Sequence, residues 1–214
     1  DCALTDIDGM TRTNTTILDP ERGTTTHLRE EGFRVTGKDL QRLAEALRKQ
    51  LQPAGQSVRV VFAGSLPPGV NGAALVQLME SCRDCGARVV LDTSGPPLQA
   101  AVESGLVETV KPNLAELGQC LGRNVGQIDP VGAARELLDR ADTVLLTLGE
   151  RGACLVREEG QVGTRCPLEP REVENTVGCG DAFLAGWLDA VEGGRRPAHA
   201  LRWAAAAGAA SARG

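Results

Sequence analysis

Short apolar runs alternate along the chain with longer stretches in which apolar residues recur every three or four positions. The runs have the length and composition of buried strands, and they span Val58–Ala63, Arg88–Asp92, Glu108–Lys111 and Thr143–Thr147. Helical spacing marks other stretches, as in Leu40, Leu43, Leu47 and Leu51, or in Leu75, Leu78, Met79 and Cys82. This alternation predicts an α/β protein built from βαβ units, with helices on both faces of a mostly parallel sheet.

Two of the predicted helices have start signals. Thr36 with Asp39 resembles a capping box, in which an N-cap residue and the third helical residue bond each other's backbone amides. Asp129 followed by Pro130 fits an N-cap and a first-turn proline, which predicts a helix over Val131–Arg140. The first helix therefore begins close to residue 36.

Two antiparallel hairpins are expected outside the parallel part of the sheet. Ala153–Val156 and Gln161–Thr164 flank a charged turn that contains glycine, which predicts a hairpin at the sheet edge. Nearer the start of the chain, Thr11–Leu18 and Thr24–Leu28 are rich in threonine and bracket the turn Asp19–Gly23. We expect this second pair to form a separate hairpin that ends where the first helix begins.

Composition and charge argue against several classes of protein. The chain has 214 residues, of which 42% are hydrophobic and 24% charged, as in an ordinary folded domain. A formal charge of -5 and the lack of a basic run argue against a nucleic-acid partner. The longest weakly apolar stretch, Trp203–Ala212, is too short to span a membrane. We expect a cytosolic protein that acts on small molecules.

Seven cysteines are scattered along the chain, and their odd number argues against a disulfide framework. Cys82 and Cys85 have the spacing of a zinc site, but no clear second ligand pair accompanies them. Packing of reduced thiols within a helix is the favoured interpretation.

The segment Asn175–Phe183 is the most informative candidate for chemistry. Gly178 and Gly180 let the backbone bend immediately before a stretch with helical spacing. The amides at a helix N-terminus point away from the helix, and the positive end of the helix dipole lies at the same terminus. This turn therefore predicts an anion site. Asp181 lies in the first turn of the same helix.

Two interpretations of Asp181 stay open from the residues alone. A carboxylate in the first turn of a helix is commonly a cap or a partner of the helix dipole. Beside a phosphate cradle, a carboxylate can instead be the base that deprotonates an alcohol during phosphoryl transfer.

The segment up to Asp181 resembles the GAGD signature of the ribokinase/PfkB sugar kinases, with Cys179 in the place usually held by alanine or serine. Other stretches resemble that family in order and approximate spacing: Ala63–Val70, Leu91–Gly95, Val110–Glu116 and Leu146–Gly152. This collinear set is more specific than any single motif, and it is most similar to the phosphofructokinase and tagatose-6-phosphate kinase branch. The resemblance implies a ribokinase-like fold and a sugar-phosphate kinase that uses ATP and Mg2+.

The resemblance also implies roles for single residues. The amides of Gly178, Cys179 and Gly180 would form an anion hole beside the base Asp181. The residues implied to bind the nucleotide are Lys111, Asn113, Glu116, Thr147, Gly149 and Gly152. Glu116 is associated in the family with magnesium, indirectly through water.

Some of these residues have a simpler structural interpretation. Asn113 as an N-cap and Glu116 three positions later make an ordinary capping box, which spacing alone favours. Lys111 fits a solvated strand end, although its place before Pro112 would also let it reach the nucleotide phosphates. Turn chemistry is sufficient to explain Asp92–Gly95.

The acceptor site is expected near Thr11–Asn14, which resembles the element that contacts the sugar phosphate in this branch, and Arg12 and Asn14 are its candidate residues. The planar guanidinium of Arg12 suits an anionic oxygen pair, but on an exposed hairpin it could equally be a solvated charge. Ser65 follows a parallel strand at its carboxyl end, where ligands usually bind, and its alternative is an N-cap.

The resemblance implies fructose 6-phosphate or fructose 1-phosphate as the acceptor, with tagatose 6-phosphate next, and a bisphosphate as the product. It divides the chain into residues 1–35, part of a β lid with its return to the core, and residues 36–214, an incomplete kinase core. Lids of this family often take part in dimers, which leaves a homodimer open.

The family begins with a strand and a glycine-rich segment that are not found here, so we expect a sequence truncated at its N-terminus and near its C-terminus. A truncated fragment that binds nucleotide or sugar phosphate without turnover is the competing hypothesis.

Overall fold

The computed structural model describes residues 4–19, 22, 24–52, 58–124, 129–169 and 172–213. Its strands are β1 Asn14–Asp19, β2 Thr24–Arg29, β3 Arg59–Ala63, β4 Arg88–Asp92, β5 Val107–Val110, β6 Ala141–Thr147, β7 Ala153–Arg157 and β8 Gly160–Thr164. Its α-helices are α1 Gly37–Leu51, α2 Gly72–Asp84, α3 Gly95–Glu103, α4 Leu114–Cys120, α5 Pro130–Glu136, α6 Cys179–Glu192 and α7 Pro197–Ala212. Two 3₁₀ turns occupy Leu137–Asp139 and Gly149–Arg151.

Six strands form one sheet in the order β3-β4-β5-β6-β7-β8. Strands β3 to β6 are parallel, and β7 and β8 continue the sheet antiparallel. Parallel neighbours need crossover connections, and α2, α3 and the pair α4–α5 supply them in turn. The predicted parallel sheet with an antiparallel edge is therefore confirmed.

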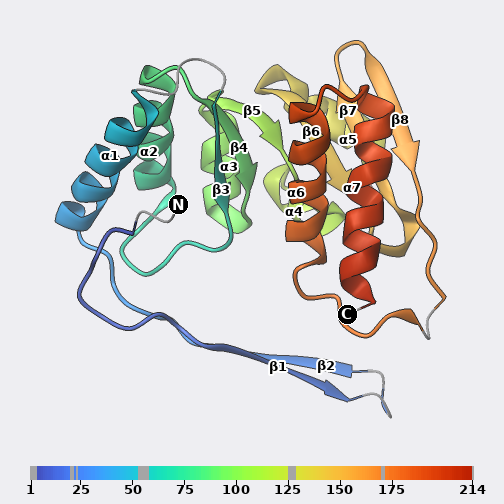
Figure 1. The fold of residues 1–214 in the computed structure, drawn as a ribbon, viewed down its shortest axis with the longest axis horizontal. Helices are drawn as coiled ribbons and strands as arrows, with labels where there is room; N and C mark the ends of the chain where they lie inside the picture. Colours follow the sequence, from blue (N-terminus) through green and yellow to red (C-terminus); the bar gives the residue numbers. More distant parts are fainter. Residues whose placement is uncertain are drawn as a thin grey trace.

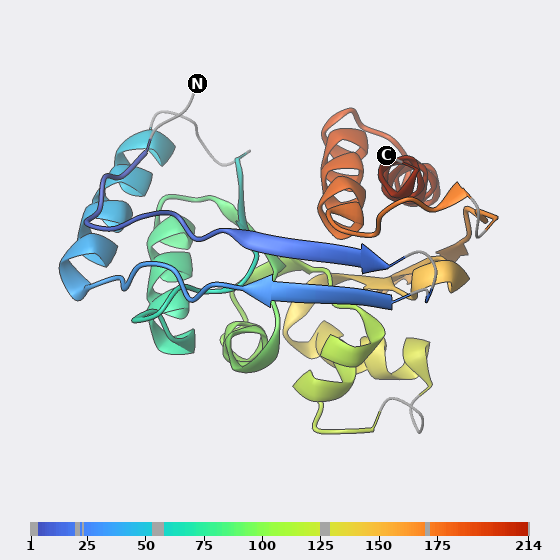
Figure 2. The same cartoon turned by 90° about the horizontal axis from the view of Figure 1, so that it is seen from below.

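Helices cover both faces of the sheet (Figures 1 and 2). Helices α2 to α5 pack on one face against Leu91 and Leu146, and α6 and α7 pack on the other against Val90 and Leu145. Successive strand residues point to opposite faces, so neighbouring residues of β4 and β6 contribute to different layers. Helix α1 extends the first layer through Leu51, which packs beside α2.

Helices α6 and α7 approach closely because small residues face each other. A Cβ atom on Gly186 of α6 would lie 2.8 Å from the Cβ of Ala207. A Cβ on Gly208 of α7 would lie 3.1 Å from the carbonyl oxygen of Cys179. The alanine-rich sequence of α7 thus brings its backbone against the beginning of α6.

Strands β1 and β2 form a separate antiparallel ribbon, which projects below the body in the view of Figure 1. The predicted hairpin is confirmed, although β1 begins at Asn14 rather than Thr11. Residues 20, 21 and 23 of its expected turn lie outside the described part of the chain. Ile17 and Leu28 of the ribbon remain 50% and 55% exposed, so this two-stranded sheet presents apolar surface to solvent.

The chain returns from the ribbon to the body at Val35, whose amide donates to the carbonyl of Pro68 over 2.8 Å. Gly69 has φ +93°, and a Cβ there would lie 2.1 Å from the Val35 carbonyl oxygen, so this close approach requires glycine. Thr36 and Asp39 then form the predicted capping box at the start of α1.

Asp129 caps α5 as predicted, by accepting from the amides of Val131 and Gly132. The α-helix ends at Glu136, however, so the predicted range to Arg140 was too long. A 3₁₀ turn follows because the chain must tighten before β6 begins at Ala141.

Cys82 lies fully buried beside α1, so it packs in the core as predicted, while Cys85 is half-buried. Among the described residues, no group of three or more His, Cys, Asp or Glu side chains is arranged to hold a metal ion. In the same part of the chain, no helix combines the length and apolar character needed to cross a membrane.

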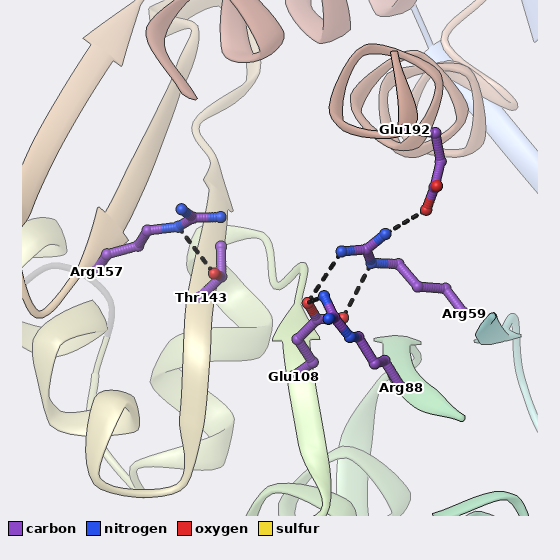
Figure 3. Close-up of polar contacts among 6 residues, drawn as sticks. All are labelled: Arg59, Arg88, Glu108, Thr143, Arg157 and Glu192. Carbon is purple, nitrogen blue, oxygen red and sulfur yellow. Dashed lines mark hydrogen bonds and ion pairs between the residues drawn. The ribbon is translucent and has the colours of Figure 1, made fainter. Parts of the chain in front are cut away.

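A network of charged side chains lies at the amino ends of the parallel strands (Figure 3). Arg59 of β3 donates to both carboxylate oxygens of Glu108 of β5, over 3.0 and 3.1 Å, and pairs with Glu192 at the end of α6. Arg88 of β4 approaches Glu108 at 3.4 Å. The side chains of Arg59 and Glu108 are only 15% and 17% exposed, so this bidentate pair is largely shielded from water.

A second polar contact joins the sheet to the middle of α6. Arg157 of β7 donates to the hydroxyl of Thr143 over 3.0 Å, as Figure 3 shows, and its guanidinium lies 6.0 Å from the ring centroid of Trp187. Trp187 belongs to α6, so the helix is held to the sheet at its centre as well as at its end.

The shielded network predicts a clear difference between two ion pairs. Arg59→Ala leaves the carboxylate of Glu108 without its main partner, so we expect the free energy of unfolding to fall by about 2 kcal/mol. Arg123→Ala removes an exposed pair with Glu136 and should cost about 0.5 kcal/mol or less. Urea unfolding of the two variants measures both values. A loss for Arg59→Ala as small as the loss expected for Arg123→Ala would show that the network does not stabilise the fold.

Candidate active site

The carboxyl ends of the parallel strands meet the start of α6 at one edge of the sheet. Ser65 follows β3, Asp92 ends β4, Lys111 follows β5 and Thr147 ends β6. The ammonium of Lys111 lies against the first turn of α6, 3.3 Å from where a Cβ on Gly180 would be. Ligands of open α/β sheets bind at this edge, and most of the residues singled out in the sequence gather there.

The N-terminus of α6 begins without a side-chain cap. Its N-cap is Gly178, which has φ +81° and is in the left-handed conformation that glycine adopts readily. The amides of the first turn of a helix have no partner within the helix. At α6 the amide of Cys179 donates to the carbonyl of Thr176 over a long 3.4 Å contact. A helix N-terminus of this kind suits an anion. The anion site expected at Gly178, Cys179 and Gly180 stays a prediction.

Asp181 is exposed at the third position of α6, and its carboxylate makes no hydrogen bond to any described residue. A capping carboxylate at that position would accept from the N-cap amide. The side chain is therefore not used as a cap, which leaves it free for chemistry.

Glu116 shows the opposite behaviour at the third position of α4. Its carboxylate accepts from the amide of Asn113 over 2.8 Å, and the side chain of Asn113 accepts from the amide of Glu116 over 2.9 Å. The capping box expected from their spacing is present. Any role of these two residues toward a nucleotide or magnesium stays a prediction.

Lys111 is not a solvated strand end, since its side chain is only 6% exposed. Its ammonium lies 3.0 Å from a carboxylate oxygen of Asp92, whose side chain is 14% exposed. The turn-based interpretation of Asp92–Gly95 missed this partner. Asp92 and Lys111 lie on different strands, and the sequence gave no sign of their pairing because it depends on the register of β4 and β5.

The environment of Asp92 connects the ion pair to Asp181. Burial raises the pKa of Asp92 above its ordinary value, the nearby Lys111 opposes this rise, and the negative charge of Asp181 adds to it. Asp92, Lys111 and Asp181 therefore lie within electrostatic reach of one another.

A cavity of about 600 Å³ borders the first turn of α6, within the range of small-molecule sites. The residues predicted from the sequence that line it are Asn113, Thr147, Gly149, Gly152, Cys179 and Gly180. Its described lining does not include Lys111, Glu116 or Asp181. The first turn of α6 thus borders the cavity with two residues and presents Asp181 outside it.

Part of the cavity wall was missed by the sequence analysis. Arg165 and Cys166, from the segment after β8, line it, as do small residues of α7 such as Ala205 and Ala209. Arg165 is oriented by a 3.1 Å hydrogen bond from its Nε to the carbonyl of Glu150. The alanine-rich composition of α7 was a usable signal, because small side chains leave space beside the helix backbone.

The turn between β6 and β7 forms another wall of the cavity and depends on Gly152. This residue has φ +94°, and a Cβ there would lie 2.1 Å from the carbonyl oxygen of Thr164. The amide of Thr147 donates to the carbonyl of Pro112 over 3.0 Å, which ties the ends of β5 and β6 together. The predicted grouping of Thr147, Gly149 and Gly152 is thus a rigid turn at the cavity.

Arg12 and Ser65 are in direct contact although 53 residues separate them in the sequence. Nη2 of Arg12 donates to the Ser65 hydroxyl over 2.6 Å and to its carbonyl over 3.3 Å. Ser65 is not a helix cap, because α2 begins after its own N-cap, Asn71. Asn14 lies exposed at the start of β1. Two of the three candidate acceptor residues therefore meet at the carboxyl edge of the parallel strands.

The model of the pfkB family carbohydrate kinases matches residues 1–213. The chain belongs to this family. The 1-phosphofructokinase of Rhodobacter capsulatus is 39% identical over 200 residues, which covers 92% of this chain and 62% of that protein.

Solved structures of related proteins have the same fold as this pfkB-family chain. Phosphofructokinase-2 from Escherichia coli in complex with fructose-6-phosphate matches with a TM-score of 0.80 and 27% identity, over 93% of this chain and 64% of that one. Arabidopsis thaliana ribokinase complexed with ribose and ATP matches with a TM-score of 0.70 and 19% identity, over 97% of this chain and 64% of that one. The ribokinase-like fold expected from the sequence is confirmed, and the chain spans less than two thirds of the length of these relatives.

The reactivity of the cysteine thiols provides a test of which cysteines are exposed and which are buried. Cys166 is exposed and Cys179 half-buried, so both should react with a thiol reagent near neutral pH, Cys166 first. Burial raises the pKa of Cys82 to about 11, so it holds less reactive thiolate than an ordinary cysteine and should react last. Peptide mapping after timed labelling gives the order, and early modification of Cys82 would contradict the described packing of α1 and α2.

Proposed function

We propose that this pfkB-family protein transfers the γ-phosphoryl group of ATP to a hydroxyl of a ketohexose phosphate, giving a bisphosphate. The names of its relatives favour fructose 1-phosphate or fructose 6-phosphate as the acceptor, and tagatose 6-phosphate is the next candidate. One observation carries the proposal. At the start of α6, a helix N-terminus without a side-chain cap, a carboxylate that bonds no described residue and a large cavity meet within one helical turn.

The nucleotide is proposed to occupy the cavity. Its phosphates would lie at the amides of Gly178, Cys179 and Gly180, where the helix dipole favours negative charge. Its base would lie toward the small apolar residues of α7, including Ala205 and Ala209, which line the cavity. The part of the nucleotide between its phosphates and its base would contact Thr147, Gly149 and Gly152.

The chemical step follows from the free carboxylate of Asp181. Asp181 accepts the proton of the acceptor hydroxyl, the oxygen forms a bond to the γ-phosphorus, and the bond from that phosphorus to the β–γ bridging oxygen breaks, releasing ADP. Charge builds up on the transferred group, and the amides at the start of α6 stabilise it. Asp181 lies outside the cavity lining, which suits a base that faces the acceptor rather than the nucleotide.

Magnesium is proposed to accompany the nucleotide. It would neutralise charge on the phosphates, and it commonly keeps several waters and few protein ligands. Glu116 suits an indirect, water-mediated role, because one of its carboxylate oxygens is already engaged by the amide of Asn113.

Residues 1–35 are proposed to act as part of a lid over the acceptor, and residues 36–214 as the kinase core. The exposed apolar side chains of Ile17 and Leu28 give the ribbon a surface that a second copy could cover, so a homodimer through the lid is part of this proposal. Arg12 and Ser65 would bind the phosphate of the acceptor where the ribbon reaches the sheet.

Asp181→Asn removes the base while keeping the size of the side chain. We expect turnover to fall by about 10²–10⁴-fold with little change in ATP affinity. Asp189→Asn, at an exposed position further along α6, is the matched control and should leave turnover unchanged. Turnover by the 214-residue chain and isothermal titration with ATP are the measurements.

Near-normal turnover of Asp181→Asn would refute the base. A wild-type chain that binds ATP but turns over none of the three ketohexose phosphates would instead support the non-catalytic fragment.

Arg12→Ala removes the proposed phosphate ligand of the acceptor. Losing a charged hydrogen bond should raise the Michaelis constant for the preferred sugar phosphate by about 10–100-fold and leave that for ATP unchanged. Arg22→Ala, at the far end of the same ribbon, is the control and should change neither constant. An unchanged Michaelis constant for the sugar phosphate in Arg12→Ala would exclude this role.

A further inference from the structure

The ion pair of Asp92 and Lys111 leaves part of a buried ammonium unused. The two side chains are 14% and 6% exposed, and removing both charges from water costs several kcal/mol in free energy. An ammonium has three N–H donors, and the side chain of Asp92 is the single polar partner of Lys111 in the described part of the chain. Its remaining donors can therefore serve a further acceptor.

The unused donors lie beside the proposed anion site. Nζ of Lys111 lies against Gly180, 3.3 Å from where a Cβ on that residue would be. Asp92 from β4 pairs with it, and Asp181 from α6 lies within electrostatic reach of Asp92. A phosphate at the amides of Gly178 to Gly180 would bring additional negative oxygens close to the same ammonium.

We infer that Asp92 is a counter-charge that competes with a bound phosphate group for the ammonium of Lys111. With no anion bound, Asp92 neutralises the positive charge of Lys111 and holds its ammonium in place. With an anion at the first turn of α6, the ammonium serves both, and the negative charge of Asp92 weakens the anion's binding. The inference rests on the proposed function for the identity of the anion, a nucleotide phosphate, and it assigns to Asp92 the setting of that affinity.

The test compares wild-type chain with Asp92→Asn by isothermal titration with inorganic phosphate, ATP and adenosine. Asparagine keeps the shape of the side chain and an oxygen that accepts from Lys111, but removes the charge. We expect phosphate and ATP to bind about tenfold more tightly, because a repulsive charge at short range in a shielded site is gone. Adenosine carries no phosphate, and its affinity should not change.

Glu136→Gln is the control, because it also removes one negative charge from an ion pair, on α5, which packs on the opposite face of the sheet from α6. It should leave all three affinities unchanged, whereas a general effect of net charge would shift phosphate binding in both variants. Phosphate and ATP affinities that are unchanged or weaker in a folded Asp92→Asn variant would overturn the inference. Thermal unfolding of each variant verifies that it is folded.

Asp92→Asn leaves a buried ammonium without its counter-charge, so a second variant covers the case in which it does not fold. The double variant Asp92→Asn/Lys111→Gln contains a neutral pair of similar shape. It should bind phosphate about tenfold more weakly than wild type, with unchanged adenosine affinity, and unchanged phosphate affinity would also overturn the inference. If the variants show these binding effects but the wild-type chain phosphorylates no sugar phosphate, the proposed function is refuted and the inference still stands.

Discussion

The ammonium of Lys111 lies against the first turn of α6, 3.3 Å from where a Cβ on residue 180 would be. At the other end of the same helix, Glu192 pairs with Arg59, which is held in turn by Glu108. An ion pair to a parallel strand thus secures the carboxyl end of α6, and the side chain of Lys111 packs against its first turn. The uncapped amides, the orientation of Asp181 and one wall of the cavity all depend on where this helix lies on the sheet.

Local signals in the sequence were sufficient for much of this arrangement. Apolar runs of strand length alternate with helical spacing, and together they predicted the sheet and its two helical layers. The capping box of Thr36 and Asp39, the cap at Asp129 and the glycine-rich start of α6 were found for the same reason. Each depends on residues only a few positions apart, whose preferences act in any context.

Contacts between distant parts of the chain could not be found in this way. The pairing of Asp92 with Lys111 depends on the register of two strands, and the wall formed by Arg165 and Ala205 depends on how α7 packs. Spacing alone also gave Glu116 and Asp181 the same interpretation, a carboxylate at the third position of a helix. Only the structure separates them, because one carboxylate caps its helix and the other makes no such bond.

The cavity draws its described lining almost entirely from one continuous part of the chain, between Thr147 and Ala212, with Asn113 as the exception. The contact of Arg12 with Ser65 belongs to the opposite end of the sequence. Nucleotide binding and acceptor choice would therefore be encoded in separate stretches. Exchanges within the first seventy residues could diversify the sugar that is used while the nucleotide half remains unaltered, which is a simple route by which one scaffold acquires many acceptors.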